Sequence, residues 1–165
     1  MAQAQREEVI ALCSNIFDLD YRYLLDLCPD RVHVLGYVQG RLVSHALWLD
    51  RRMRVGGGPW QIAAYVEGVA THPDYEGRGY GSAVMRRLAQ EIGRYAFGAL
   101  SPAVPEWYER LGWVRWQGPL LIERDSVVEV TTDPEEMVLI YRTPRTGALD
   151  LTATLTGEWR PFEPW

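Results

Sequence analysis

Residues 66–82 read VEGVATHPDYEGRGYGS, an order that predicts an apolar strand, a short turn, a glycine-rich loop and the start of a helix. Gly77, Gly79 and Gly81 let the backbone approach an anion, and the unpaired amides and dipole of the first helical turn attract it. Ser82 caps this helix or adds one more donor. The stretch therefore predicts a phosphate-binding loop. The alternative is an ordinary strand-to-helix connection that is rich in glycine.

The kind of phosphate ligand is narrowed by residues that the chain lacks. It contains no lysine, which excludes a Walker-type loop and a Schiff-base mechanism. The alternating glycines also do not match the G-x-G-x-x-G pattern of dinucleotide folds. A pyrophosphate held by backbone amides and Arg78 remains, and coenzyme A carries such a group.

Two motifs resemble those of the GNAT superfamily of N-acetyltransferases. Residues 76–81 are similar to its Gln/Arg-x-x-Gly-x-Gly/Ala loop, with Glu76 where the family has Gln or Arg. Residues 103–113, AVPEWYERLGW, resemble its second motif, a short helix carrying a Tyr before Leu-Gly-aromatic. The resemblance implies the GNAT fold, an α/β (α+β) architecture with a mixed central sheet flanked by helices. In that sheet an antiparallel meander adjoins a splayed parallel strand pair.

Within this superfamily, the chain is most similar to the aminoglycoside 2'-N-acetyltransferases. The stretches that carry this likeness are 65–70, 98–101, Tyr108 with Gly112-Trp113, 116–119 and the final Trp165. The resemblance implies acetyl transfer from acetyl-coenzyme A to the 2'-amine of an aminoglycoside, by direct attack without a covalent enzyme intermediate, and a role in antibiotic resistance. Alternatives are another small amine, a protein amino terminus, or a non-catalytic coenzyme A sensor.

Hydrophobic periodicity predicts the order of elements. Two helices, at 6–17 and 19–28, precede a three-strand antiparallel meander that begins at Arg31, turns at 39–40 and 56–59, and ends with a strand over 61–70. A helix over 81–92 then leads to a strand at 96–100, and this order implies a right-handed parallel crossover. A helix beginning near Pro105 and ending at Gly112, and strands at 113–124 and 136–143, follow. The Trp-ended tail is predicted to pack back near the site.

Composition sets further bounds. The 165 residues are 47% hydrophobic, which predicts one domain, 1–165. A net charge of −5 argues against a nucleic-acid partner and mildly favours a cationic substrate. The absence of a leader or a long apolar run predicts a cytoplasmic protein with no membrane partner. The sequence leaves open whether the protein forms a homodimer.

Several side chains are predicted to be structural. Cys13 and Cys28 lie in apolar helical patterns and read as buried thiols. The three histidines, His33, His45 and His72, are separated in sequence without a metal-ligand pattern, so no metal is expected. Arg51, Arg52 and Arg54 flank a turn and read as a solvated face.

Acetyl transfer to an amine needs a base for the ammonium and a proton for the departing thiolate. Glu67, in an otherwise apolar strand just before the loop, is the candidate base, directly or through a water; its alternative is an exposed edge position. Tyr108 is the candidate acid by the resemblance, and its alternative is simple packing. The resemblance also places the amide of Val69 near the thioester oxygen. The predicted cofactor residues are Val69, Ala70, Thr71, Gly77, Arg78, Gly79, Tyr80, Gly81 and Ser82.

Carboxylates are predicted to bind the cationic substrate. Asp18 and Asp20 lie at the junction of the first two helices, where the similar family places such acids. A later loop and the tail supply the others by resemblance; they are Asp133, Glu135 with neighbouring Glu136, Glu163 and the terminal carboxylate of Trp165. Helix capping or simple solvation is the alternative for the internal acids.

Overall fold

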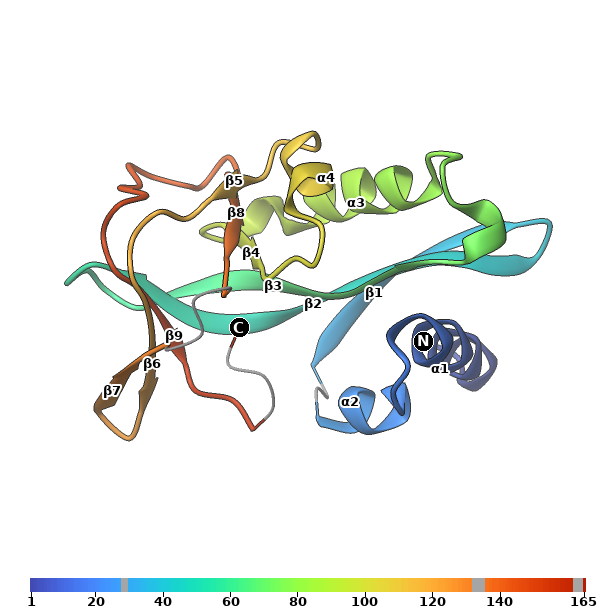
Figure 1. Ribbon diagram of the computed structural model, residues 1–165, viewed down its shortest axis with the longest axis horizontal. Helices are drawn as coiled ribbons and strands as arrows, with labels where there is room; N and C mark the ends of the chain where they lie inside the picture. Colours follow the sequence, from blue (N-terminus) through green and yellow to red (C-terminus); the bar gives the residue numbers. More distant parts are fainter. Residues whose placement is uncertain (28–29, 132–135, 162–164) are drawn as a thin grey trace. The chain divides into compact units, whose positions relative to one another are not determined.

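The computed structural model describes residues 1–27, 30–131, 136–161 and 165. Contacts define two compact units, Met1–Leu49 with Val66–Glu91, and Asp50–Tyr65 with Ile92–Trp165. The elements in chain order (Figure 1) are α1 (Gln3–Phe17), α2 (Tyr21–Leu27), β1 (Arg31–Val38), β2 (Arg41–Val55), β3 (Gln61–Thr71), the 3₁₀ turn η1 (Pro73–Tyr75), α3 (Tyr80–Glu91), η2 (Ile92–Arg94), β4 (Gly98–Leu100), α4 (Pro105–Glu109), β5 (Val114–Arg115), β6 (Leu120–Arg124), β7 (Val127–Val130), β8 (Leu139–Tyr141) and β9 (Leu155–Glu158).

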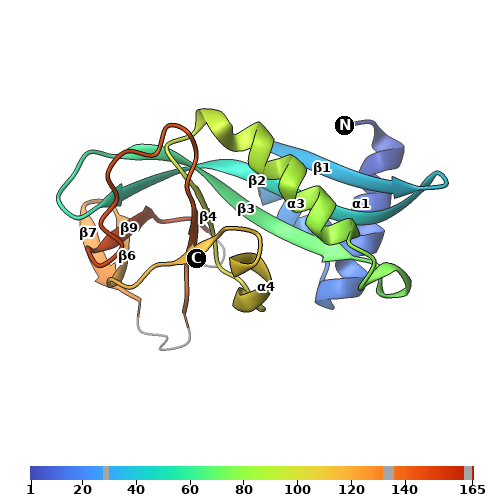
Figure 2. The same ribbon diagram turned by 90° about the horizontal axis from the view of Figure 1, so that it is seen from above.

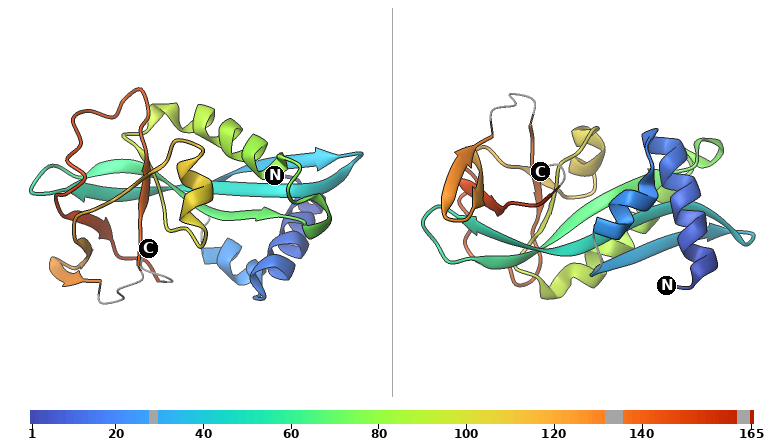
Figure 3. Two further views of the ribbon diagram at one scale, coloured as in Figure 1. Left: turned by 45° about the horizontal axis from the view of Figure 1, so that its top comes forward. Right: turned by 90° about the horizontal axis from the view of Figure 1, so that it is seen from below.

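In the first unit, helices cover both faces of the sheet made by β1, the beginning of β2 and the end of β3. α3 crosses one face (Figure 2), and α1 and α2 pack side by side on the other (Figure 3). A Cβ added at Gly36 would lie 3.0 Å from Val84 Cγ2, so glycine lets α3 approach β1 closely. The core beneath α1 and α2 consists of Val9, Ile10, Leu12, Cys13, Tyr21, Leu25, Leu42, Leu47 and Ala70.

The predicted meander is confirmed in this unit. β1 pairs antiparallel with β2 from Arg31↔Leu49 to Val38↔Arg41, and β2 and β3 are neighbours in the sheet. Strong period-two patterns separated by glycine turns made these strands predictable. The two predicted amino-terminal helices are also present, although Cys28, at the end of the second, lies outside the described residues.

The second unit is built on the strand order β5-β8-β4-β3-β2-β9-β6-β7. β4 runs parallel to β3 through Ala64↔Gly98 and Tyr65↔Ala99, which confirms the predicted parallel pair. β8 is antiparallel to both β4 and β5, whereas β9 is antiparallel to β2 and parallel to β6. The unit is therefore a mixed sheet, as predicted.

Several predicted boundaries were wrong. The strand expected over 113–124 is divided into β5 and β6, because the chain passes Ala153 closely at Gly118, where an added Cβ would lie 1.8 Å from a carbonyl oxygen. α4 ends at Glu109, and Gly112 lies in the following turn with φ +91°. Strands β7 and β9 were not predicted. α3 begins at Tyr80, which places Ser82 inside the first turn, not at the cap.

In the part of the chain that the structure describes, no helix is both long enough and apolar enough to cross a bilayer.

Candidate functional site

The predicted phosphate loop joins β3 to α3 in the first unit. His72 Nδ1 accepts a hydrogen bond from the Asp74 amide at 3.2 Å and caps the turn η1. Gly77 and Gly79 have φ values of +69° and +85°, which side chains with a Cβ rarely adopt. A Cβ added at either glycine would meet nothing within 4 Å. The loop therefore presents open backbone at the amino terminus of a twelve-residue helix, the arrangement that binds phosphate.

Two arginines surround Tyr75 in this loop. The guanidinium carbons of Arg78 and Arg41 lie 5.7 and 5.8 Å from the centroid of the Tyr75 ring. Arg41 also lies 2.7 Å from His72 Nε2 through its Nη2. Sequence reasoning missed Arg41, although the meander places the beginning of β2 near the end of β3.

Glu67 is half-buried in β3, directly before a change in backbone direction. Gly68 has φ +58°, and a Cβ added there would lie 1.8 Å from the Tyr21 hydroxyl oxygen. Farther along the strand, Ser44 Oγ donates to the Ala70 carbonyl at 3.1 Å and lies 3.0 Å from Thr71 Oγ1. Neighbouring side chains thus hold the backbone on which Glu67 and the predicted pantetheine-binding residues lie.

Gly68→Ala is expected to destabilise the protein by about 2–4 kcal/mol, because a left-handed backbone and a steric clash with Tyr21 add. Gly77→Ala is the matched control: its φ is also positive but its surroundings are open, so it isolates the backbone cost of about 1–2 kcal/mol. Urea denaturation of both variants measures the difference. Equal losses in the two would show that the contact with Tyr21 contributes nothing.

The histidines are not as separate as their spacing suggested. His33 Nδ1 lies 2.8 Å from His45 Nε2, and Cys13 Sγ lies 3.4 Å from His45 Nδ1. Burial, followed by the nearby Arg31 charge, lowers the pKa of His33 to about 4, and burial, followed by the charge of His33, lowers the pKa of His45 to about 3. Cys13 is a buried thiol, as predicted, with its pKa raised by burial to about 12.

The two acids between α1 and α2 lie at helix ends. Asp18 is the exposed residue that ends α1, with φ +53°. Asp20 Oδ1 accepts a hydrogen bond from the Arg22 amide at 3.0 Å at the beginning of α2. Each therefore has a structural task, and substrate contact stays a prediction for both. Asp133, Glu135 and Glu163 lie outside the described residues. Glu136 Oε1 accepts a hydrogen bond from Ser101 Oγ at 3.1 Å, and its contact with substrate stays a prediction.

Tyr108 lies on α4 in the second unit. Its ring makes edge contacts with Trp107 and Trp113, with centroids 4.7 and 6.4 Å apart. Burial raises the pKa of the Tyr108 hydroxyl well above its usual range, so the phenol keeps its proton at any physiological pH. A phenol that keeps its proton among aromatic rings can donate a hydrogen bond.

The carboxy-terminal tryptophan is held by the second unit. Trp165 is 3% exposed, and its indole nitrogen donates to Thr131 Oγ1 at 2.6 Å. The guanidinium carbon of Arg51 lies 5.0 Å from the Trp165 ring and 4.4 Å from the Tyr65 ring. The prediction that Arg51 belongs to a solvated face was therefore wrong, since only 4% of it is exposed. The final residue is therefore packed, as expected, whereas its position near the site stays a prediction.

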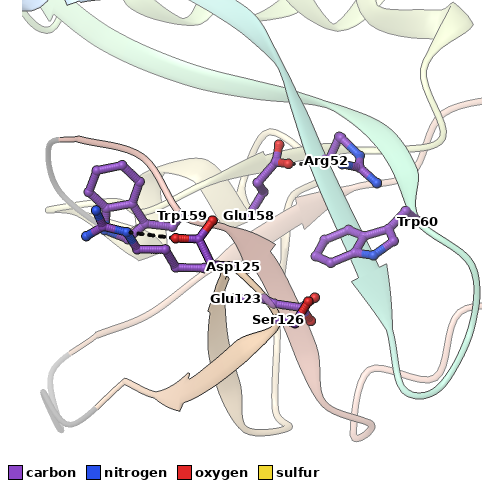
Figure 4. A pocket seen from close by; sticks show the side chains of 8 residues that line it. Arg52, Trp60, Glu123, Asp125, Ser126, Glu158 and Trp159 are labelled. Atoms are coloured by element: carbon purple, nitrogen blue, oxygen red, sulfur yellow. Dashed lines mark hydrogen bonds and ion pairs between the residues drawn. The ribbon is translucent and has the colours of Figure 1, made fainter.

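A separate pocket of about 370 Å³ lies on the second unit (Figure 4). Its acids have arginine partners: Glu158 pairs with Arg52 at 3.0 Å, and Glu123 contacts Arg54. None of the residues predicted to be catalytic lines it.

Among the residues that the structure describes, no three histidine, cysteine or carboxylate side chains are grouped to hold a metal ion. The predicted site residues offer carboxylates, a phenol and backbone amides. These groups support proton transfer and carbonyl polarisation.

Comparison with known proteins places this architecture in a family. Residues 5–115 match the acetyltransferase (GNAT) domain. An aminoglycoside 2'-N-acetyltransferase from Mycolicibacterium fortuitum is 31% identical over 167 residues, covering 98% of this chain and 83% of the relative. The chain therefore belongs to the GNAT family of acetyltransferases, which use acetyl-coenzyme A as the acetyl donor.

Solved structures share the fold at lower identity. A GNAT family N-acetyltransferase from Escherichia coli in complex with CoA is 14% identical, with a TM-score of 0.67, covering 95% of this chain and 86% of that one. A probable N-acyltransferase from Enterococcus faecalis is 20% identical with a TM-score of 0.62, covering 72% of this chain. This chain spans only 31% of the length of the Enterococcus protein. These likenesses show the GNAT fold.

Proposed function

We propose that this acetyltransferase acetylates the 2'-amine of an aminoglycoside-like amino sugar. The observation that carries the proposal is the position of Glu67: it is half-buried near the end of β3, next to the positive φ of Gly68, and the phosphate loop follows this strand. Similarity to the Mycolicibacterium fortuitum enzyme, named for the same reaction, supports the choice of substrate. We place the reaction in the cytoplasm, where acetyl-coenzyme A is present, and a contribution to antibiotic resistance follows if the substrate is a drug.

In the proposed reaction, backbone groups bind two parts of the coenzyme, the pyrophosphate and the pantetheine arm. The loop at Gly77 and Gly79 holds the pyrophosphate with help from Arg78 and Arg41. The edge of β3 from Val69 to Thr71 hydrogen-bonds the pantetheine arm as a neighbouring strand would.

Proton transfer then uses two side chains. Glu67 removes a proton from the substrate ammonium, directly or through a water, because only the free amine has a lone pair for attack on the thioester carbon. The Val69 amide stabilises the oxyanion that forms. When the carbon–sulfur bond breaks, Tyr108 gives its proton to the departing thiolate. The attacking nitrogen loses its second proton as the amide forms, and this proton, passed through solvent, restores the Tyr108 phenol. The acetylated amine and coenzyme A leave.

Steady-state release of coenzyme A with a panel of amines tests this function. We expect turnover with aminoglycosides that carry a 2'-amine and little with polyamines or peptides. A thermal shift with acetyl-coenzyme A, without turnover of any amine, would instead identify a coenzyme A sensor. Turnover restricted to peptides or polyamines would identify another member of the same fold.

The tail supplies a further expectation. If the Trp165 carboxylate faces the substrate ammonium, amidating it removes one charge-assisted hydrogen bond, which costs about 1.5–3 kcal/mol. This loss corresponds to a roughly 10- to 150-fold lower kcat/KM for the amine. Amidation keeps the indole that contacts Thr131 and Arg51, so binding of acetyl-coenzyme A should hardly change. A variant ending at Pro164 and an amino-terminally tagged enzyme are the comparisons, and equal kcat/KM in all forms would make the tail purely structural.

A further inference from the structure

A chain of side-chain hydrogen bonds runs through the first unit to the backbone of β3. Arg31 Nε donates to His33 Nε2 at 3.2 Å, and His33 Nδ1 lies 2.8 Å from His45 Nε2. His45 Nδ1 lies 2.7 Å from the carbonyl oxygen of Gly68. This series of hydrogen bonds therefore ends at Gly68, the residue that follows Glu67 and changes the direction of β3.

The direction of every bond in this chain is fixed from its two ends. The Gly68 carbonyl can only accept, so His45 carries its proton on Nδ1. A neutral His45 then accepts at Nε2, and His33 must donate from Nδ1. His33 accepts at Nε2 from Arg31, whose guanidinium only donates. One protonation state, with both histidines neutral and both in the Nδ1–H form, satisfies all three bonds.

An added proton would break the chain. With a second proton on His45, its Nε2–H would face the Nδ1–H of His33. With a second proton on His33, its Nε2–H would face the Nε–H of Arg31. The interior also resists the charge, because His45 is fully buried between Cys13 of α1 and Gly68 of β3. The lowered pKa values of both histidines agree with this neutral state.

The carbonyl that His45 holds belongs to the same peptide unit as the amide of Val69. The peptide is planar and trans, so its C=O and N–H point in opposite directions. Because His45 holds the Gly68 oxygen on the side of the sheet where α1 lies, the Val69 N–H points away from α1. Gly68, with its positive φ, permits this rotation of the peptide.

We propose that His45 is a positioning residue for acetyl transfer: it orients the Gly68–Val69 peptide, so that the Val69 amide points at the thioester oxygen, while His33 and Arg31 hold His45 in the required tautomer. This inference rests on the proposed function, which gives Val69 the oxyanion. His45 touches neither substrate and acts through the backbone. An amide donor fixed before the reaction acts mainly on the transition state.

The first test reads the tautomers without any substitution. Nitrogen-15 NMR of the imidazole rings in the full-length protein at neutral pH should show both His33 and His45 as Nδ1–H forms. A histidine in water prefers the other form, so the unfolded protein is the reference. Finding His45 or His33 protonated on Nε2 would overturn the hydrogen-bond chain.

The second test separates positioning from stability. His45→Leu removes the donor and is expected to lower kcat by about 10²-fold, the effect of losing one oxyanion donor, with little change in acetyl-coenzyme A affinity. His45→Asn can place an amide N–H near the former Nδ1 and should recover most of that kcat. Leu12→Ala is the matched control, because it weakens the same core without touching the chain.

The outcomes distinguish the inference from the function on which it rests. If the wild-type enzyme is active and His45→Leu keeps the kcat of Leu12→Ala, the positioning role is wrong and the proposed function stands. If the wild-type enzyme acetylates no amine, the proposed function fails and the role of His45 fails with it. If His45→Leu does not fold, the kcat of His45→Asn and the tautomers of the two histidines test the positioning role instead. Val69→Pro, which lacks the Val69 amide, gives the kcat expected without the oxyanion donor. A His45→Asn variant with a kcat as low as that of Val69→Pro would contradict the positioning role.

Discussion

Replacing Glu67 with glutamine is expected to lower kcat by about 10²- to 10⁴-fold near neutral pH while leaving the affinity for acetyl-coenzyme A unchanged. The amide has the shape of the carboxylate but cannot accept the proton of the substrate ammonium. The loss should shrink at high pH, because the free amine then forms without the base. Steady-state kinetics over pH, with cofactor affinity from calorimetry, measure both quantities.

Glu91→Gln is a matched control for this substitution. Glu91 lies on the exposed side of α3 and pairs with Arg87 one helical turn away, far along the sequence from β3. An exposed ion pair of this kind contributes little, so kcat should not change. If Glu67→Gln also keeps wild-type rates at neutral pH, the base is another group.

Tyr108→Phe is expected to reduce kcat by about 10²-fold or more, with cofactor affinity again preserved. The substitution removes only the hydroxyl, so the edge contacts of the ring with Trp107 and Trp113 remain. Because the thiolate would leave without its proton, the chemical step should slow. Single-turnover kinetics in the presence of saturating amine isolates that step from product release.

Tyr141→Phe provides the comparison in the same aromatic cluster. The Tyr141 ring lies 5.3 Å from Trp113, centroid to centroid, and the proposed reaction gives it no role. Tyr141→Phe should have the same kcat as the wild-type enzyme within experimental error. An unchanged kcat in Tyr108→Phe would return Tyr108 to a packing role.

Much of the fold could be predicted because its signals are local. The meander, α3 and the parallel β3–β4 pair follow from strong periodicity and glycine turns. β9 could not be predicted, because Leu155–Glu158 is short and pairs with β2 and β6, which are distant in the sequence. β7 is exposed at every position and so carries no alternating pattern.

The candidate site divides in the same way. The glycine loop is contiguous in sequence, and its motif was readable. The bonds from His33 to His45 and on to Gly68 join three segments, and only strand pairing brings them together. Arg51 was misread as solvated although it shares its strand face with Met53, a fully buried residue two positions away. Alternation along β2 was the signal that could have corrected this prediction.

Locating the acetyl group on the product tests the central claim most directly. The full chain would be incubated with acetyl-coenzyme A and an aminoglycoside that carries a 2'-amine, and in parallel with its congener that carries a 2'-hydroxyl. The account predicts one acetyl group on the 2'-nitrogen by NMR, one coenzyme A released for each product, and no comparable reaction of the congener. Acetylation at another nitrogen, or equal reaction of the two compounds, would contradict it.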